Sequence, residues 1–438
     1  MKVTFFGGAQ EVGRSCLMIS TEKTKILLDA GIKLGTVEEH PMIQDSTLKE
    51  IDGIFISHAH LDHIGYLPHI YSTGYRGLIY STKPTMELTN VLISDYMHIS
   101  EPKDVTKEGL AKLHKSYKVC EFNEDVKVKD LTIRFIHSGH IVGSSMISVS
   151  DGKSTLIYSG DLNLAKTKLL EGADTKNLNA KTLIIESTYG AKKDVFPKEG
   201  VVAQHALKSI QETIKIGGKV IIPSFAVGRA QEILLMLDDY MNSGLIPKVP
   251  IYVDGMINKA MRIHRHNVIY CRKELQSRIL MSDYDPFRSD NFIPVESKQQ
   301  RSKVVTETTS SIIVTTSGML TGGPVIYYLS KLSGNPANKV ILVGYQAEGT
   351  PGRALKEGAK RLRLDNGRIT VDIKLVVDAQ HLSAHADRPQ LETMIKKVNG
   401  LKTVYIMHGE KSKSEDLRES IANKYKAIVP KNLESYEV

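Results

Sequence analysis

One hexapeptide, His58–His63 (HAHLDH), places three imidazoles and a carboxylate within six residues, directly after the apolar stretch Ile54–Ser57 (IFIS). The apolar stretch predicts a short buried strand, and a loop at the end of a strand directs alternate side chains to neighbouring points in space. Imidazole and carboxylate groups are ligands of zinc, and manganese and iron also accept them. The hexapeptide therefore predicts a metal centre at the end of a β-strand.

Two further polar residues stand at the same kind of position. His140 in His137–His140 (HSGH) and Asp161 in Ser159–Asp161 (SGD) each lie where an apolar strand pattern gives way to glycine. Taken alone, such a histidine is more often an ordinary satisfied or exposed residue, and an aspartate after glycine is usually a turn residue. Together with the hexapeptide, both become candidate ligands of a two-metal site.

The secondary-structure pattern changes along the chain. The first third is rich in short strand patterns, whereas from about Lys198 apolar strands alternate with amphipathic helices, which predicts a parallel sheet. Gly7–Gly13 (GGAQEVG) is followed by a strand pattern instead of a helix, which argues against a dinucleotide loop and predicts a tight β connection. The basic, glycine-containing stretch Pro351–Arg368 is interpreted as a return linker.

Composition narrows the class of protein. The chain has 438 residues, of which 41% are hydrophobic and 24% charged, an ordinary globular composition. Lys and Arg exceed Asp and Glu by 58 to 49, and the net charge of +9 favours a polyanionic partner such as nucleic acid. Three scattered cysteines without a CxxC pair argue against a disulfide framework or zinc ribbon. We find no signal peptide and no apolar run of the ~20 residues that span a membrane, so we expect a cytoplasmic protein.

The order of these motifs resembles the metallo-β-lactamase superfamily. HAHLDH, the Gly-His pair at His140 and Ser-Gly-Asp at Asp161 match its metal motifs, and Asp29 in LLDAG matches its first motif. The resemblance implies an αββα sandwich with a dinuclear metal site at one edge of the sheets. It also implies that Asp29 orients metal ligands through hydrogen bonds.

Three later motifs are similar to the β-CASP branch of that superfamily, whose members process nucleic acids. They contain Glu186 (ESTYG), His385 (SAHAD) and His408 (MHGE). Other stretches resemble the archaeal and eukaryotic cleavage and polyadenylation specificity factor nucleases, with ribonuclease J as a close relative; they span residues 223–231, 316–324 and 344–353.

This resemblance implies a particular domain order. A metallo-β-lactamase domain in two segments, 1–192 and 363–438, would be interrupted by an inserted α/β β-CASP domain with a parallel sheet at 193–362, with the active site in the cleft between them. Many archaeal relatives carry KH domains ahead of this core, and we find no GXXG-bearing extension here. We therefore expect the core domains, a dimer partner or another protein to select the substrate.

Carried over residue by residue, the resemblance implies a complete two-metal site with two Zn²⁺, or Mn²⁺ as the alternative. The implied ligands of one metal are His58, His60, His140 and Asp161, and those of the other are Asp62, His63, His408 and the bridging Asp161. Non-catalytic members of the family lose some of these ligands, so the complete set favours an active enzyme.

The implied chemistry is hydrolysis of RNA phosphodiester bonds. Two cations lower the pKa of a shared water, so that metal-bound hydroxide attacks phosphorus in line, and the cations offset charge on the non-bridging oxygen. His385 is the candidate general acid for the leaving 3′ oxygen, Glu186 is expected to orient it, and Asp62 completes the catalytic set. Without the family, His385 would be interpreted as a surface histidine and Glu186 as an ordinary exposed carboxylate.

The inserted domain carries candidate contacts for the RNA backbone. Small residues with backbone N–H groups after a strand can form anion-holding concavities. Basic clusters at 262–266, 272–273 and 360–368 would extend an RNA track, although a charge run is usually only a solvated face. The candidate phosphate-binding residues are Ser224, Arg229, Ser317, Gly318, Gly322, Gly323, Arg353 and Ser383.

Three functional hypotheses stay open from the sequence. The first is a zinc-dependent ribonuclease of mRNA 3′-end processing or RNA turnover, acting on single-stranded RNA as an endonuclease, a 5′–3′ exonuclease or both. The second is a hydrolase of thioesters, lactones or β-lactams, which explains HAHLDH but not His385, His408 or the insertion. The third is a scaffold subunit of an RNA-processing or exosome-type complex, which the full ligand set disfavours. The resemblance also allows a homodimer through the C-terminal region at Ile428–Val438.

Overall fold

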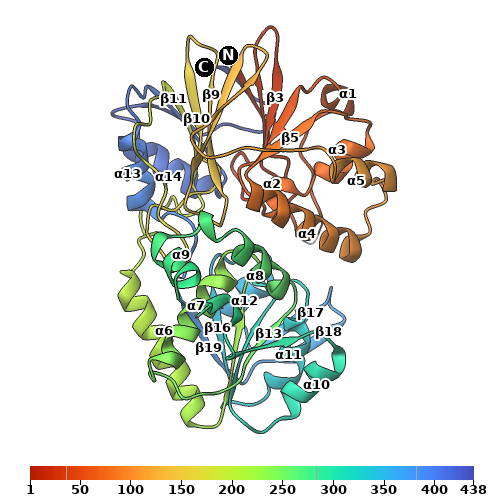
Figure 1. The fold of residues 1–438 in the computed structure, drawn as a ribbon, viewed down its shortest axis with the longest axis vertical. Helices are drawn as coiled ribbons and strands as arrows, with labels where there is room; N and C mark the ends of the chain where they lie inside the picture. The colour runs from red at the N-terminus through yellow and green to blue at the C-terminus, as the bar shows by residue number, and fades with distance from the viewer. Residues whose placement is uncertain (36, 283, 381) are drawn as a thin grey trace. The chain divides into compact units, whose positions relative to one another are not determined.

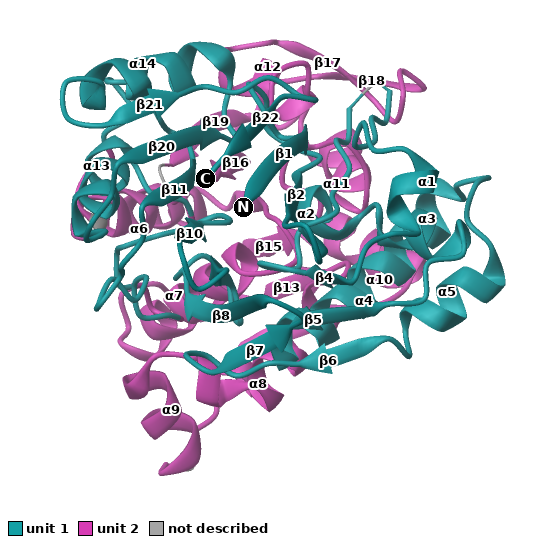
Figure 2. Ribbon diagram, turned by 90° about the horizontal axis from the view of Figure 1, so that it is seen from above, with its two compact units in different colours: residues 1–166, 170–195, 385–438 teal, residues 167–169, 196–384 magenta. Residues whose placement is uncertain are grey.

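The computed structural model describes residues 1–35, 37–282, 284–380 and 382–438. The chain forms two compact units, which are coloured separately in Figure 2. Unit 1 comprises residues 1–166, 170–195 and 385–438, and unit 2 comprises residues 167–169 and 196–384. The inserted arrangement of unit 2 within unit 1 is visible in the colour sequence of Figure 1.

Unit 1 contains two seven-stranded sheets. The first sheet has the order β22 (Ser435–Glu437), β1 (Lys2–Gly7), β2 (Cys16–Ser20), β3 (Lys25–Leu28), β4 (Gly53–Phe55), β5 (Leu78–Ser81) and β6 (Tyr117–Val119). The second has the order β21 (Lys426–Ile428), β20 (Thr403–Met407), β11 (Thr182–Glu186), β10 (Thr155–Tyr158), β9 (Ser145–Ser150), β8 (Leu131–His137) and β7 (Asp125–Val128). The two chain ends lie side by side because β22 pairs with β1.

Alternating side chains build the layers of unit 1. In β3, Ile26 and Leu28 face the core between the two sheets, whereas Leu27 faces the helices on the other side. Those helices are α1 (Asp45–Leu48), α2 (Leu61–Ile64), α3 (Leu67–Ser72), α4 (Lys83–Ser100) and α5 (Lys107–Leu113). The second sheet is covered by α13 (Arg388–Lys397) and α14 (Lys411–Ile421). The predicted αββα sandwich is therefore confirmed.

Unit 2 is built on a six-stranded sheet whose paired strands are all parallel. Its order is β14 (Phe292–Val295), β13 (Ile251–Asp254), β15 (Ser311–Thr315), β12 (Lys219–Pro223), β16 (Lys339–Val343) and β19 (Val376–Gln380). Its helices include α6 (Glu199–Lys215), α7 (Arg229–Asn242), α8 (Ile257–His266), η1 (Val268–Tyr270), α9 (Lys273–Leu280), η2 (Pro286–Arg288), α10 (Lys298–Thr306), α11 (Val325–Leu332) and α12 (Pro351–Lys356). The predicted α/β insertion with a parallel sheet is confirmed.

The linker predicted for Pro351–Arg368 is wrong. This stretch forms α12 and the strand β17 (Arg361–Leu364), which pairs antiparallel with β18 (Ile369–Asp372). Alternation decides the outcome, because Leu362 and Leu364 enter the core of unit 2 while the intervening cations stay outside. Since β19 then joins the parallel sheet, unit 2 continues to residue 384, beyond the predicted boundary at 362.

The glycine-rich segment Gly7–Gly13 connects β1 to β2, which pair antiparallel with Gly7 opposite Cys16. The predicted tight β connection is confirmed. The connection also touches residues of the candidate site. The N–H of His408 donates to Gly8 O at 2.7 Å, and the N–H of Ser15, two residues after the segment, donates to Asp62 O at 2.8 Å. This connection therefore helps to fix the backbone around two candidate ligands.

Candidate metal centre

The candidate ligands leave the carboxyl ends of strands in both sheets of unit 1. In the second sheet β10, β11 and β20 are parallel. Asp161 follows β10, Glu186 ends β11 and His408 follows β20. In the first sheet the parallel strands β3 and β4 lead to Asp29 and to the hexapeptide that begins at His58. Parallel strands end at one edge of a sheet, so residues far apart in the sequence meet there.

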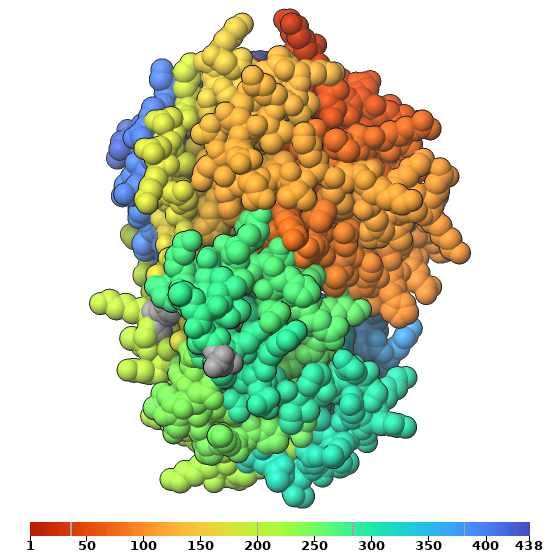
Figure 3. All heavy atoms as spheres, in the orientation of Figure 1, coloured from red at the N-terminus to blue at the C-terminus, as the bar shows by residue number. Residues whose placement is uncertain are grey.

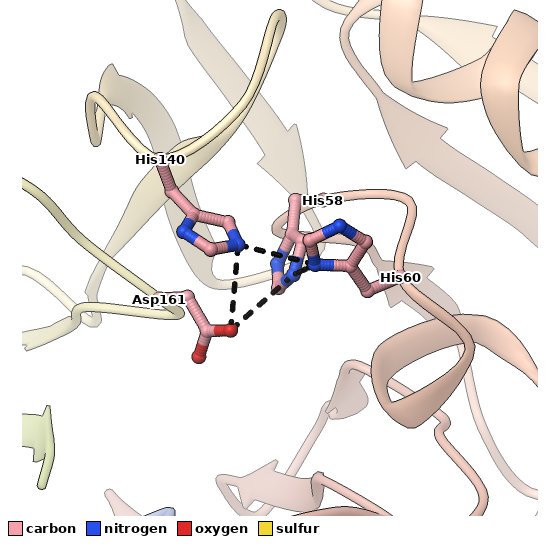
Figure 4. A group of neighbouring side chains, drawn as sticks. All are labelled: His58, His60, His140 and Asp161. Carbon is pink, nitrogen blue, oxygen red and sulfur yellow. Dashed lines mark hydrogen bonds and ion pairs between the residues drawn. The ribbon is translucent and has the colours of Figure 1, made fainter. Parts of the chain in front are cut away.

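Four predicted ligands form a first group, shown in Figure 4: His58, His60, His140 and Asp161. Each offers one ligand atom, and these atoms all lie within 4.8 Å of one another. Asp161 Oδ2 lies 3.4 Å from His58 Nε2 and 3.7 Å from His140 Nε2. Such spacing between nitrogen and oxygen donors leaves room for one ion among them.

Asp62, His63 and His408 form a second group with the same 4.8 Å limit. His408 Nε2 lies 3.3 Å from Asp62 Oδ2, and its Nδ1 lies 3.2 Å from Asp161 Oδ1. His63 Nε2 lies 3.5 Å from the same Asp161 Oδ1. Asp161 thus turns one oxygen toward each group, the arrangement expected of a bridging carboxylate.

Two buried atoms test whether this site suits cations. His63 Nε2 and Asp161 Oδ1 have no hydrogen-bond partner among the described residues. A buried polar atom without a partner costs free energy, so such atoms are rare in folded proteins. A divalent cation bound between them would satisfy both, and a set of imidazole and carboxylate donors suits zinc or manganese. The residues present therefore fit a metal site.

A buried hydrogen-bond network centred on Asp29 holds the ligands in place. Asp29 accepts hydrogen bonds from the N–H and the hydroxyl of Ser57, both at 2.7 Å, and from the Tyr158 hydroxyl at 2.8 Å. It also lies 2.7 Å from His63 Nδ1. Because Nδ1 donates to this carboxylate, Nε2 is the ring nitrogen left to bind a metal. Asp29 therefore fixes the ring of His63 by a hydrogen bond, and its role in orienting metal ligands stays a prediction.

Ser57 and Tyr158 are functional neighbours that the sequence did not reveal. Ser57 stands directly before the hexapeptide, and its hydroxyl lies 3.1 Å from His58 Nδ1, so its position next to a ligand was an available signal. Tyr158 ends β10 three residues before Asp161. An inward-facing tyrosine in an apolar strand is indistinguishable from an ordinary core residue by pattern alone.

The backbone at the site adopts demanding conformations. Asp29 and His408 have positive φ angles of 60° and 48°, a region that non-glycine residues rarely occupy. Gly31 has no room for a side chain, because an added Cβ would lie 1.7 Å from Asp62 O. Gly160, with φ of 51°, would bring a Cβ to 2.8 Å from the Ser57 Cβ. Gly31 therefore allows two loops of the first sheet to approach closely, and Gly160 allows a loop of the second sheet to approach one of the first.

Burial and charge shape the protonation of the ligands. Burial alone would raise the pKa of Asp161, but His408 and His63 hold it well below its usual range. Burial lowers the pKa of His58 well below its ordinary value, with His63 adding to the effect. Asp161 is therefore ionised and His58 neutral, the forms in which these two groups bind metals. Burial alone would lower the pKa of His63 and of His408, but neighbouring carboxylates, Asp161 first, raise both, so metal binding at these two rings would release protons.

Glu186 and His385 form a pair beside the first group. His385 Nδ1 lies 3.1 Å from each oxygen of Glu186, and Glu186 Oε1 also accepts from the N–H of Leu162 at 2.8 Å. Burial alone would lower the pKa of His385, but the carboxylates of Glu186 and Asp161 raise it to about 9. His385 Nδ1 lies 3.9 Å from Asp161 Oδ2, so this pair adjoins the ligands.

Five of the eight candidate phosphate contacts lie in loops that follow the carboxyl ends of two strands in unit 2. Ser224 follows β12 and Ser317 follows β15, its neighbour in the parallel sheet. Gly318 packs against the Ser224 loop, because an added Cβ would lie 3.0 Å from the N of Phe225. Gly322 and Gly323 follow in the same loop. The N–H of Gly322 donates to the Ser317 hydroxyl, and the N–H of Ser317 donates to Gly322 O.

The other three candidates are placed differently. Arg229 begins α7 and is only 7% exposed, which limits its reach toward a backbone phosphate. Arg353 lies on α12 and forms an ion pair with Glu357. Ser383 lies in the last residues of unit 2, outside any helix or strand. The structure brings the Ser224 and Ser317 loops together, and the role of all eight residues stays a prediction.

Comparison with protein families defines the class. Residues 18–188 match the metallo-beta-lactamase superfamily domain, residues 230–355 the Beta-Casp domain, and residues 368–430 the Zn-dependent metallo-hydrolase RNA specificity domain. The fold, the groups of candidate metal ligands and these three family matches together show that the chain is an RNA-related protein of the metallo-β-lactamase type. Among the described residues, no helix is long and apolar enough to cross a membrane.

Individual relatives narrow the family. The chain is 36% identical to proteins named transcription termination factor FttA from Methanothermobacter thermautotrophicus and from Methanocaldococcus jannaschii, each match covering 100% of this chain and 72% of the relative. The FttA of a Lokiarchaeum species is also 36% identical, over 99% of this chain and 71% of the relative. The chain belongs to this archaeal β-CASP family, similar to cleavage and polyadenylation specificity factors, as the motifs predicted.

A solved structure supports the fold alone. A protein of unknown function from Enterococcus faecalis V583 has a TM-score of 0.59 to this chain at 14% identity, with 99% of each chain covered.

Proposed function

We propose that this protein is a metal-dependent ribonuclease that hydrolyses phosphodiester bonds in single-stranded RNA. One observation carries the proposal: Asp161 turns one oxygen toward each of two groups of ligands, at 3.4 Å from His58 Nε2 and 3.2 Å from His408 Nδ1. A carboxylate shared in this way is suited to a pair of cations, and two-metal sites of this kind serve phosphodiester hydrolysis.

Each ligand group would hold one divalent cation, for which we propose zinc, with manganese as the alternative. The two sets share Asp161; the first adds His58, His60 and His140, and the second adds Asp62, His63 and His408. Cations bound there supply a Lewis acid for the phosphoryl oxygens and lower the pKa of water. Asp29 keeps His63 turned toward this site through its 2.7 Å contact with Nδ1.

His385 is proposed to give a proton to the leaving 3′ oxygen. Its Nδ1 is held by both oxygens of Glu186 at 3.1 Å, so Nε2 is the ring nitrogen available to deliver a proton. The Glu186 carboxylate keeps the imidazolium form populated at neutral pH, because it favours the charged ring. The N–H of Leu162 in turn fixes Glu186. General acid catalysis of this kind contributes about 10²- to 10⁴-fold.

The names of the relatives suggest a setting for this activity. They are termed transcription termination factors, and cleavage of a nascent transcript would generate an RNA 3′ end. We therefore propose RNA 3′-end formation or RNA turnover as the process that uses this site. Endonuclease and 5′–3′ exonuclease action, pairing through the C-terminal region and membership of a larger complex stay predictions.

One gel tests the proposal. RNA labelled at the 5′ or the 3′ end, with a 5′ triphosphate or monophosphate, is incubated with the unsubstituted protein and with His63→Ala. We expect cleavage by the first and none by the second. Release of mononucleotides from monophosphorylated RNA alone would identify an exonuclease. Hydrolysis of a thioester or nitrocefin-like substrate without action on RNA would contradict the proposal and favour the alternative hydrolase.

A further inference from the structure

The net positive charge of the chain comes from one of its two units. Unit 1 contains 32 Lys and Arg against 32 Asp and Glu, whereas unit 2 contains 26 against 17, a difference of +9. The net charge of the whole chain is also +9. The unit that holds the candidate metal ligands is therefore neutral, and the attraction for a polyanion comes from unit 2.

Within unit 2, the cations gather on α8 and the segment that follows it. Residues 255–273 include five Lys and Arg and no Asp or Glu. On α8, Lys259, Arg262 and His266 are exposed, and their spacing of three and four residues places them on one helical face. The opposite face is buried against the unit and includes Met261 and His264.

Two of the five cations, Arg265 and Arg272, form ion pairs with Asp285 and Glu274, and the charge of the others is only weakly neutralised. Arg262 lies 3.9 Å from Glu296, and both side chains are largely exposed, at 70% and 66%, so the pair contributes little. Lys259, His266 and Lys273 have no ion-pair partner among the described residues. The face therefore keeps most of its charge available for a ligand.

Apolar side chains stand beside this charged face. Ile269 on η1 is 69% exposed, and Leu280 and Met281 at the end of α9 are 63% and 84% exposed. The Gln276 side chain ties α9 to η1 by donating to Ile269 O at 3.0 Å. The segments that carry α8 and α9 lie on the face of unit 2 that Figure 3 presents. Cations next to exposed apolar groups suit single-stranded nucleic acid, which offers phosphates and unstacked bases together.

We propose that α8, η1 and α9 form an accessory binding surface for single-stranded RNA, built from residues of unit 2 alone. Lys259, Arg262 and Lys273 contact phosphates, and Ile269 and Met281 contact bases. The inference rests on the proposed function in taking RNA as the substrate, but it does not require cleavage. It assigns RNA affinity to unit 2 and chemistry to the ligand cluster of unit 1.

The test separates binding from cleavage. Affinity for fluorescein-labelled oligouridylate is measured by fluorescence anisotropy over a range of salt concentrations, with the full chain in EDTA so that no RNA is cut. The variant is Lys259→Ala/Arg262→Ala/Lys273→Ala. The matched control, Lys208→Ala/Lys215→Ala/Lys303→Ala, removes three exposed lysines from other helices of unit 2. Thermal melting checks that both variants fold.

We expect the α8–α9 variant to bind RNA about tenfold more weakly. The slope of log affinity against log salt concentration should also become less steep by about 2, because each of the three lost phosphate contacts removes about 0.7 from that slope. The control is expected to match the unsubstituted protein. Unchanged affinity and slope in the α8–α9 variant, or an equal loss in the control, would overturn the proposal; the first result would point to another partner, such as an acidic protein. If the unsubstituted protein with metal does not cleave RNA but the α8–α9 variant still binds RNA more weakly, the binding surface is supported and the proposed nuclease activity is contradicted.

Discussion

The imidazole of His63 and the carboxylate of Asp161 face each other with 3.5 Å between Nε2 and Oδ1, and neither atom has a hydrogen-bond partner among the described residues. Both side chains are buried, so water does not satisfy them freely. A cation shared by this nitrogen and this carboxylate oxygen would account for two buried atoms that form no hydrogen bond.

Replacing Asp161 is expected to affect both ligand groups at once. Asp161→Ala should lower the bound metal from two ions per chain, one for each group, to one or none, because each group loses an oxygen ligand. Elemental analysis of the purified protein measures this. Tyr158→Phe is the control, since it removes one hydrogen bond to Asp29 and no ligand. An Asp161→Ala protein with unchanged metal content would rule out the bridge.

Replacing His385 should separate catalysis from metal binding. His385→Ala is expected to slow RNA cleavage about 10²- to 10⁴-fold while leaving metal content close to normal, because His385 belongs to neither of the two predicted ligand sets. Single-turnover kinetics and elemental analysis on the same preparation provide the two readouts. Loss of metal from this variant would show that His385 is a ligand, since the ligand atoms of Asp161, Glu186 and His385 also lie within 4.8 Å of one another.

The pH profile should respond to Glu186. The pKa of His385 is raised to about 9, with Glu186 the main attractive cause, so the acid form is present at neutral pH and is lost as the pH rises through that value. Glu186→Gln removes the carboxylate charge and should therefore move the alkaline limb of the cleavage rate to lower pH. A limb that stays in place in this variant would mean that another group controls it.

Loss of Asp29 should destabilise unit 1. Its buried carboxylate meets two donors of Ser57 and one each of His63 and Tyr158, so Asp29→Ala leaves several buried groups without partners. We expect a loss of about 3–5 kcal/mol in the free energy of unfolding, as when one partner of a buried charged network is removed. Denaturant titration followed by tyrosine fluorescence measures the change. Tyr158→Phe should cost only about 1 kcal/mol, and equal losses in the two variants would contradict the central place of Asp29.

The sequence alone predicts those candidate ligands that lie close together in the chain. His58, His60, Asp62 and His63 are placed by a single strand, turn and helix start, so their spacing alone predicts a metal centre. His140, Asp161 and His408 depend on which strands become neighbours in the sheet. Spacing does not encode that order, and the resemblance to a family supplied it instead.

The largest error in the fold has a physical reason. Charged residues are frequent between Pro351 and Arg368, and this composition predicts a linker. The alternation of Arg361 to Leu364 places two leucines in the core, and burial of such side chains contributes about 1.5–3 kcal/mol each. A period of two across four residues is too short to stand out against the surrounding charges. In the same way, Tyr158 gave no signal because its hydrogen bond to Asp29 joins different sheets.

Reconstitution of the metal-free protein tests the central claim most directly. Zinc is removed with a chelator and returned in measured amounts, while cleavage of labelled RNA is followed at each step. Two ligand groups that share Asp161 predict no cleavage without metal and a rate that reaches its plateau at two equivalents of zinc per chain. Undiminished cleavage by the stripped protein, or a plateau with the first equivalent, would contradict the account.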